Sequence, residues 1–424
     1  MKRRLLVALS IAAVSVFIAV QSMPLQGQTQ SQSTIGANTP DLVVTAYNGG
    51  PPIPYTVPRT PWGDPDLQGA WSSDDAQFGG GGGGRGGRGG GGAARGAGGA
   101  PANAQAGAAR GAAAPATPAG PPPLYLTPEQ FEQRKKDIAA GVARAEGNEV
   151  SSTFRNDFPR RAFAQTRAIV DPPDGRQPAF TPEAEKRRAT RDQGTFGNGP
   201  FNSPEDFTLY DRCITRGIWG SVMRVIYGNG NRIVQAPGMV AISYEMIHDT
   251  RVFYTDGRPH IGNAIRQYLG DSRARWDGDT LVVETTNLTD KTSIGANGNG
   301  LRHSDKMRIV EKLKRVAPDV IQYQITIDDP VTYVRPFTAS IPLTPLDGGA
   351  LLPYDCHEGN HAVLQGLGAE RAEDAAIAAD LAKGIKRERR GAQETGTGGG
   401  RGRGAGAGGR GGAPPDPTAA PPEQ

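Results

Sequence analysis

The sequence predicts a mainly β protein, built on an antiparallel β-barrel or a two-sheet sandwich with flanking helices. From about Phe207 onward, apolar and polar residues alternate with a period of two, which is typical of strands with one solvated face. Turn signals at Gly228–Gly230 (G-N-G) and Trp276–Asp279 (W-D-G-D) separate the alternating segments. Two cysteines, Cys213 and Cys356, bracket most of this region. About eight short strands with regular turns close most naturally as a barrel or a sandwich.

Helices and turns are expected upstream of this region. Thr60–Trp71 is a turn region rich in Pro, Gly and Asp that runs into a short strand. The capping box Thr127–Gln130, with Pro at the first helical position, predicts a helix of about 15 residues. Thr181–Glu183 predicts the start of a second, more charged helix that ends near Asp192, and D-P-P-D-G at Asp171–Gly175 predicts a tight turn between the two helices.

The alternating region predicts its own strands, and the clearest alternation is in Val320–Asp328. A final helix rich in Ala, Glu and Lys is expected at Ala369–Arg389. The expected strands are Val222–Tyr227, Arg232–Gln235, Met239–Met246, Arg251–Thr255, Thr280–Thr286, Met307–Val316, Val320–Asp328 and Val334–Leu343.

The N-terminus predicts a cleaved secretory signal. Basic residues at positions 2–4 precede an apolar run of about 16 residues, Leu5–Val20, and Val20–Ser22 supplies a cleavage site. The alternative is a membrane anchor, which needs about 20 apolar residues. The run is shorter, and polar sequence follows it at once, so we expect a periplasmic or secreted protein with no transmembrane segment after cleavage.

Export bears on the two cysteines. In an oxidising compartment, Cys213 and Cys356 are expected to form a disulfide, although a pair of separate buried thiols is the alternative. The residues are 143 positions apart. In the chain-entropy model a loop of this size stabilises the fold by roughly 4–5 kcal/mol.

Two low-complexity tracts lack the apolar side chains needed to order a chain, so both are expected to be disordered. Their Arg-Gly runs have almost no interleaved aromatic residues for base stacking, so no nucleic-acid partner is expected. The expected division is a signal peptide (1–22), an N-terminal turn and strand segment (23–78), a Gly/Ala/Arg/Pro linker (79–123), a helical and Pro-rich segment (124–200), the antiparallel β domain (201–367), a C-terminal helix (368–392) and a tail (393–424).

Five motifs give the chain a family resemblance. They are T-P-W-G-D-P-D-L-Q-G-A-W (Thr60–Trp71), D-R-C-I-T-R-G (Asp211–Gly217), Y-E-M-I-H-D (Tyr244–Asp249), Y-L-G-D-S-R-A-R-W-D-G-D-T-L-V-V (Tyr268–Val283) and D-C-H-E-G-N (Asp355–Asn360). With these motifs the chain resembles a family of exported bacterial proteins that has no established activity. The resemblance implies export and a β-rich domain.

A second resemblance concerns the fold alone. Gly69-x-Trp71, at the head of the first expected strand, is similar to the G-x-W signature of lipocalin-like barrels. The resemblance implies that Trp71 closes one end of a barrel. The alternative is a turn followed by a core tryptophan.

Polar residues near the end of one expected strand are candidates for a ligand site. Alternation places Glu245 and Asp249 on one face of the strand and His248 on the other. A carboxylate that faces a barrel interior needs a cationic partner, for which Arg216, Arg224, Arg251 and Arg273 are available. If the sheet encloses a cavity, these groups would line it, and the alternative is a surface cluster of salt bridges. The ligand-binding candidates are Glu245, His248, Asp249, Arg251, Arg273 and Trp276.

His357–His361 reads H-E-x-x-H, the pattern that binds zinc when both histidines lie on one helix face. In that interpretation, His357, Glu358 and His361 would form a metal site. Gly359 and Asn360 are poor helix formers, however, so a turn after the last strand is the alternative interpretation. Zinc at this motif is the one cofactor that the sequence suggests.

Together these patterns predict an exported, non-enzymatic β domain that binds a small molecule or a cell-surface partner. The sequence has no G-x-S-x-G elbow and no phosphate-binding loop, and no catalytic residue is assigned. The alternative is an exported hydrolase that uses carboxylate and histidine groups from Glu245, His248, Asp249 and the Cys356–Asn360 turn, with or without a metal at His357, Glu358 and His361. The sequence predicts neither the ligand nor the oligomeric state.

Overall fold

A computed structural model gives the structure of residues 54–76, 78, 123–146, 159–189, 201–225, 227–295, 301–346 and 348–387. The predicted signal peptide (1–22), almost all of the predicted linker (79–123) and the predicted tail (393–424) lie outside the described residues.

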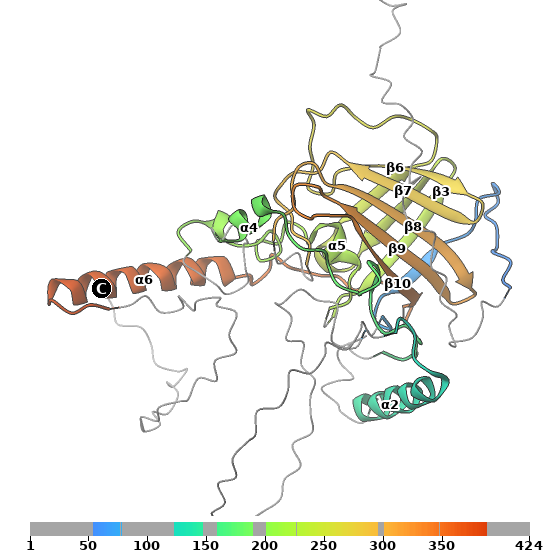
Figure 1. The fold of residues 1–424 in the computed structure, drawn as a ribbon, viewed down its shortest axis with the longest axis horizontal. Helices are drawn as coiled ribbons and strands as arrows, with labels where there is room; N and C mark the ends of the chain where they lie inside the picture. Colours follow the sequence, from blue (N-terminus) through green and yellow to red (C-terminus); the bar gives the residue numbers. More distant parts are fainter. Residues whose placement is uncertain are drawn as a thin grey trace, which may run out of the picture.

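The centre of the molecule is a closed barrel of nine strands, which confirms the predicted β-barrel fold (Figure 1). The strand order is β1-β3-β4-β5-β6-β7-β8-β9-β10, and β1 also pairs with β10 to close the barrel. The strands are β1 (Gly69–Ser72), β3 (Gly230–Ala236), β4 (Met239–Tyr244), β5 (Thr250–Tyr254), β6 (Asp271–Asp277), β7 (Thr280–Thr286), β8 (Arg308–Ala317), β9 (Val320–Asp328) and β10 (Phe337–Pro345).

One strand pair departs from the antiparallel pattern. β5 and β6 run parallel, and their ladder consists of the single pair Tyr254↔Arg273. Parallel neighbours need a crossover connection, and residues 255–270 supply it between these two strands. The barrel is therefore mixed, whereas lipocalin barrels are eight-stranded and run up and down.

Two short segments from the N-terminal part of the chain complete the sheet. β1 pairs with β10 at Thr344 and Pro345, and β2 (Ile169–Asp171) pairs with the other half of β10 at Thr338 and Ala339. The β domain therefore includes residues from both upstream segments and is not confined to 201–367.

Most predicted strands are confirmed, and Thr280–Thr286 and Val320–Asp328 match to the residue. The predicted strand Val222–Tyr227 is wrong, because Val222 ends the short helix α5 (Gly217–Val222). Every residue of α5 is buried, since this helix packs into the barrel core. The predicted strand Met239–Met246 ends at Tyr244, and the 3-10 turn η2 (Met246–His248) follows it.

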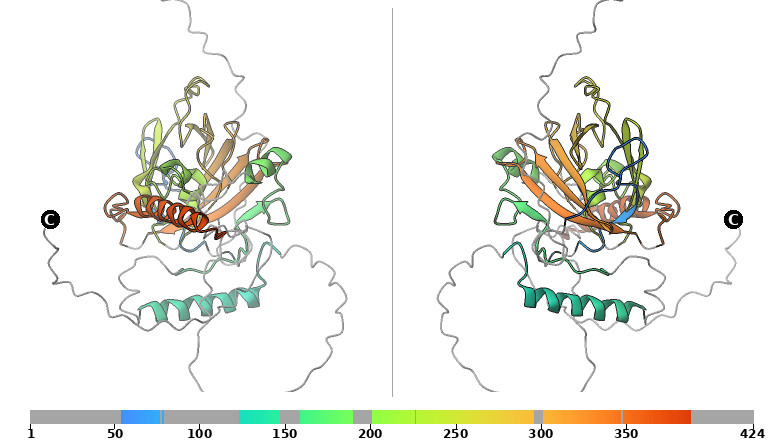
Figure 2. Two further views of the ribbon diagram at one scale, coloured as in Figure 1. Left: turned by 90° about the vertical axis from the view of Figure 1, so that its left-hand side faces the viewer. Right: turned by 90° about the vertical axis from the view of Figure 1, so that its right-hand side faces the viewer.

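The other helices lie around the barrel. α2 (Pro128–Glu146) begins at the predicted capping box, where the Thr127 and Gln130 side chains each accept a hydrogen bond from the other's backbone N–H, at 3.3 and 3.0 Å. α4 (Pro182–Ala189) starts as predicted, and η1 (Pro204–Asp206) is a single 3-10 turn. α6 (Ala362–Ala382) begins earlier than predicted and extends away from the barrel, while α2 lies apart from it (Figure 2).

The barrel interior is filled with side chains. Phe253, Leu281 and Leu313 have no exposed surface, and Trp219 of α5 packs edge-on against Phe337 at 5.5 Å between ring centroids. A cavity beside α5, lined by Trp219 and His303 among others, has a volume of about 10 Å³. That is enough for about one water molecule. Trp71 is also buried in this core and donates its indole N–H to the Leu67 carbonyl at 3.0 Å.

A buried ion pair crosses the barrel interior. The Arg251 guanidinium of β5 makes a two-pronged contact with the Glu311 carboxylate of β8, at 2.8 and 2.5 Å, and both side chains are at most 2% exposed. Tyr323 donates its hydroxyl to Glu311 at 2.5 Å. Arg251 also donates to Ser272 at 3.2 Å and to Thr285 at 3.0 Å. Burial alone would lower the pKa of Arg251, but the charge and hydrogen bond of Glu311, together with Tyr244 and Tyr323, outweigh it and raise that pKa.

We expect the free energy of unfolding to fall by about 3–5 kcal/mol in Glu311→Gln, because that change leaves the Arg251 cation buried without a counter-charge. Tyr323→Phe removes one hydrogen bond and should lower the same free energy by about 1–2 kcal/mol. Urea denaturation monitored by tryptophan fluorescence measures both. Equal stability of the two variants would contradict the assigned role of the pair.

Candidate functional site

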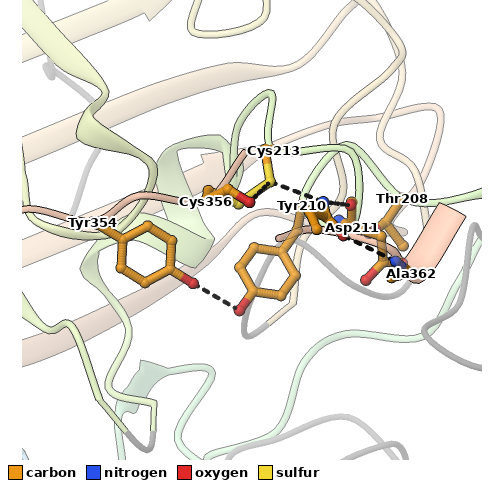
Figure 3. Close-up of a disulfide and its surroundings, with 8 residues drawn as sticks. Thr208, Tyr210, Asp211, Cys213, Tyr354, Cys356 and Ala362 are labelled. Atoms are coloured by element: carbon orange, nitrogen blue, oxygen red, sulfur yellow. Dashed lines mark hydrogen bonds between the residues drawn. A yellow bond between two sulfur atoms is a disulfide. The ribbon is translucent and has the colours of Figure 1, made fainter. Parts of the chain in front are cut away.

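The predicted disulfide is confirmed, and it lies at the end of the barrel where β3 begins and β4 ends (Figure 3). It joins Cys213, in the loop before α5, to Cys356, in the turn before α6, with 5.7 Å between their Cα atoms. The Asn360 amide donates to the Asp211 carbonyl at 2.9 Å and lies 3.1 Å from the Cys213 sulfur. The motifs D-R-C-I-T-R-G and D-C-H-E-G-N are therefore side by side. We call this region the disulfide end.

A third motif reaches the same place. The Thr215 hydroxyl donates to the Asp249 carboxylate at 2.6 Å and accepts a bond from the Gly217 backbone N–H at 3.0 Å. His248 contacts the Tyr354 ring edge-on, with 6.2 Å between ring centroids. Three of the five sequence motifs, centred on Cys213, on His248 and on Cys356, thus meet at the disulfide end.

The backbone at this end is strained. Among the described residues, four that are not glycine have a positive φ, and three of them are Cys213 (56°), Ile247 (69°) and His248 (58°). Such angles are costly for side chains with a Cβ, above all for a β-branched residue such as Ile247, at about 1–3 kcal/mol each. Ile247 and Met246 are held in a buried cluster with Val225. Strain of this kind concentrates at binding and catalytic sites.

Arg216 is the central charged group of the disulfide end. Its residue is 1% exposed, and its Nε and Nη2 atoms have no hydrogen-bond partner in the described part of the chain. Burial lowers the pKa of Arg216 to about 10, so the side chain remains a cation at neutral pH. The hydroxyls of Tyr210, Tyr354 and Tyr227 and the carboxyl of Asp249 oppose this effect electrostatically.

Three tyrosines surround this cation. The Tyr210 and Tyr354 hydroxyls are 3.4 Å apart (Figure 3), and the Tyr354 and Tyr227 rings are stacked with 6.4 Å between centroids. Burial raises the pKa values of Tyr210 and Tyr354 above their usual range, so both hydroxyls stay neutral. Tyr227 is 38% exposed and connects the cluster to solvent.

Three of the predicted site residues lie at the disulfide end. Glu245 is buried, and its carboxylate lies so close to Gly230 that a Cβ there would overlap it. His248 is exposed and Asp249 is half-buried. Burial raises the pKa of Asp249, although its hydrogen bond with Thr215 opposes the effect. The predicted alternation of Glu245, His248 and Asp249 between two faces is wrong, because the chain leaves the strand at Tyr244 and turns.

The other three predicted residues are elsewhere in the fold. Arg251 points into the barrel and is paired with Glu311. Arg273 binds Asp271 at 2.7 Å and lies beside Tyr254, at the opposite end of β5 from Asp249. Trp276, near the hairpin between β6 and β7, is partly buried against the barrel core.

The H-E-x-x-H motif forms a turn and not a helix. Gly359 has φ 70°, and His361 is the N-cap of α6, so the motif precedes the helix. His357 and Glu358 are exposed. Among the described residues, no three His, Cys, Asp or Glu side chains are grouped to hold a metal ion.

Sequence reasoning missed most of the tyrosine cluster. Tyr210, Tyr227 and Tyr354 come from three separate loops, so no local spacing relates them. Arg216 entered the sequence prediction only as an optional partner for a carboxylate. One feature of the sequence could have identified Arg216 as a site residue: it lies within the motif D-R-C-I-T-R-G, three residues after a disulfide cysteine.

The loop that carries Tyr227 is fastened to β1. Asn229 donates to Asp74 at 2.7 Å and accepts from the Val225 backbone N–H at 2.8 Å. Ser72 donates its hydroxyl to Asp74 at 2.5 Å. Burial raises the pKa of Asp74 from 3.8 to about 6, although the hydrogen bonds from Ser72 and Asn229 lower it in part.

Comparison of the chain with family models, with curated proteins and with solved structures found no match. In the part of the chain that the structure describes, no helix has the length and apolarity needed to span a membrane.

We expect Asp74→Asn to change how stability depends on pH. The folded protein holds the Asp74 proton more tightly than the unfolded chain, so wild-type stability falls as pH rises from about 4 to about 6. The variant lacks this loss and should gain about 2–3 kcal/mol relative to wild type above pH 6. Urea denaturation between pH 4 and pH 7 measures the difference. Asp277→Asn, at an exposed carboxylate, is the control and should leave the profile unchanged.

Removing the disulfide should lower the free energy of unfolding. The bond closes a loop of 143 residues, so Cys213→Ser combined with Cys356→Ser should reduce stability by about 4–5 kcal/mol in the chain-entropy model. Wild-type protein in a reducing buffer should show the same loss in urea denaturation. If both samples unfold at the wild-type urea concentration, the disulfide does not stabilise the barrel.

Proposed function

We propose that this protein is exported and that it is a non-enzymatic binding protein whose ligand is held at the disulfide end. Export rests on the predicted signal at residues 1–22, and a disulfide-bonded barrel is compatible with an oxidising compartment. Family resemblance in the five motifs supports the same location.

The packing of the barrel favours the disulfide end over the interior. Ligand pockets for small molecules usually measure about 300–1,000 Å³, whereas the cavity beside α5 is about 10 Å³. The interior charges of Arg251 and Glu311 neutralise each other, and Tyr323 and Thr285 make further hydrogen bonds with them. A ligand inside the barrel would have to displace these contacts.

The observation that carries the proposal is a buried cation without a direct partner among strained loops. Arg216 is charged and buried, Ile247 and His248 hold costly backbone angles, and the tyrosines beside them reach solvent through Tyr227. A fold tolerates such costs where function requires them.

The metal-dependent form of the alternative function, an exported hydrolase with a metal at His357, Glu358 and His361, gains no support from this geometry. A zincin places its two histidines one helical turn apart, whereas this segment is a turn with Gly359 at φ 70°. No second observation favours hydrolysis.

A ligand screen tests the proposal. The melting temperature of the purified protein is measured with a panel of small molecules that includes organic acids, sugars, amines and inorganic anions. At a concentration of about 100 times Kd, a ligand should stabilise the folded state by about 2.7 kcal/mol. We expect Tyr227→Ala and His248→Asn to remove the stabilisation, because both residues lie at the disulfide end and Asn tolerates a positive φ.

The control for this screen is Val234→Ala, an exposed position on the outer face of β3. It should respond to ligand as wild type does. A ligand whose effect survives both disulfide-end changes, or one that the protein converts to a product, would contradict the proposal.

A further inference from the structure

The two nitrogens of Arg216 that have no partner in the described chain form one edge of the guanidinium. Nε and Nη2 point their N–H groups in the same direction, which is the fork that binds a carboxylate through two parallel hydrogen bonds. Buried polar groups are almost always hydrogen-bonded, and an exception calls for a functional explanation. The shape of the unpartnered edge therefore indicates what it would bind.

The same protein shows a guanidinium paired with a carboxylate in an equally buried setting. Arg251 meets the two oxygens of Glu311 through its Nη1 and Nη2 atoms, at 2.8 and 2.5 Å. Arg216 has a comparable burial, but the Asp249 carboxyl, which acts on its charge, makes no ion pair with it and instead accepts from Thr215. A carboxylate brought by a ligand would give Arg216 the partner that Arg251 has within the fold.

The charges around Arg216 favour a single negative charge over a multiply charged anion. One guanidinium interacts electrostatically with the hydroxyls of three tyrosines and with the Asp249 carboxyl. A phosphate dianion would be repelled by Asp249, and phosphate sites usually combine several cations or backbone N–H groups. A carboxylate matches both the charge and the planar fork.

The rings beside Arg216 indicate the rest of the ligand. Tyr354 stacks with Tyr227 and meets His248 edge-on, so three rings are grouped at the disulfide end. Aromatic faces bind an apolar or planar body next to a polar head. Tyr227 is the exposed member of the group, so this ring is accessible to a ligand from solvent.

We infer that the disulfide end binds a small organic carboxylate, whose carboxyl group pairs with Nε and Nη2 of Arg216 and whose apolar body lies against Tyr227 and Tyr354. The inference rests on the proposed binding function and names its ligand class. The carboxyl group can belong to a free acid or to the end of a peptide, and both present the same chemistry.

Titration calorimetry with defined probes tests the inference. The probes are acetate, phenylacetate and its neutral counterpart phenylacetamide, inorganic phosphate, and N-acetyl-glycyl-phenylalanine with and without a C-terminal amide. We expect a carboxylate probe to bind wild type, with the amides and phosphate at least tenfold weaker. The relative affinity of phenylacetate and the peptide acid identifies the source of the carboxyl group.

Variants of Arg216 complete the experiment. Arg216→Lys keeps the charge but loses the fork, and should weaken carboxylate binding at least tenfold. Arg216→Met should abolish binding. It should also unfold at the same or a higher urea concentration than wild type in probe-free buffer, because a buried charge without a direct partner is removed. Arg232→Met, at an exposed arginine on β3, is the matched control and should bind as wild type does.

Each contrary outcome has a distinct meaning. If phenylacetamide binds as well as phenylacetate and Tyr227→Ala removes both, the binding function stands and the carboxylate inference is overturned. If carboxylates bind equally to wild type and Arg216→Lys, or if neither acetate, phenylacetate nor the peptide acid binds wild type, the inference is also overturned. A large loss of stability in Arg216→Met would assign Arg216 a structural role instead. If no ligand acts at the disulfide end at all, the proposed function fails with it.

Discussion

The barrel depends on one buried ion pair, between Arg251 and Glu311. β5 and β6 share a single backbone pair, so the ladder that closes every other strand junction is almost absent there. Arg251 bridges that junction with its side chain, since it reaches Ser272 on β6, Thr285 on β7 and the carboxylate on β8. Side-chain hydrogen bonds thus replace backbone hydrogen bonds at the weakest seam. The interior is therefore a packed core and not a ligand cavity, because the charges of Arg251 and Glu311 already neutralise each other.

The proposed function is consequently assigned to the loops at one end. β4 ends and β5 begins at the disulfide end. In the connection between them, Ile247 and His248 have positive φ angles, which do not occur in a regular strand. Backbone strain and a buried charge occur together at this end. The strained His248 contacts Tyr354, one of the tyrosines that interact electrostatically with Arg216. The division is a common one in proteins, with a rigid scaffold that holds loops in conformations they would not adopt alone.

The sequence predicted the parts of this fold that depend on local patterns. Val320–Asp328 alternates cleanly and is a strand to the residue, and the capping box at Thr127 begins a helix. The disulfide between Cys213 and Cys356 is also confirmed, and it was predictable because two thiols in a chain expected to be exported are more often bonded than free. Prediction failed where tertiary contacts decide. Val222 belongs to a helix because α5 packs with all of its residues buried in the core. Arg251 forms an interior ion pair because Glu311, sixty residues away in the sequence, lies opposite it in the barrel. Likewise, three tyrosines from separate loops cannot be grouped before the fold is known.

The disulfide has a consequence for when the binding end is completed. Tyr354 is carried by the segment that ends at Cys356, and its place beside Tyr210 depends on where that segment is tied. In a reducing cytosol the thiols would stay apart, and the precursor would lack a covalent link between the two ring-bearing loops. Under the proposed export, oxidation after secretion would link the loops that carry Tyr210 and Tyr354, and the proposed binding end would be complete only outside the cytosol.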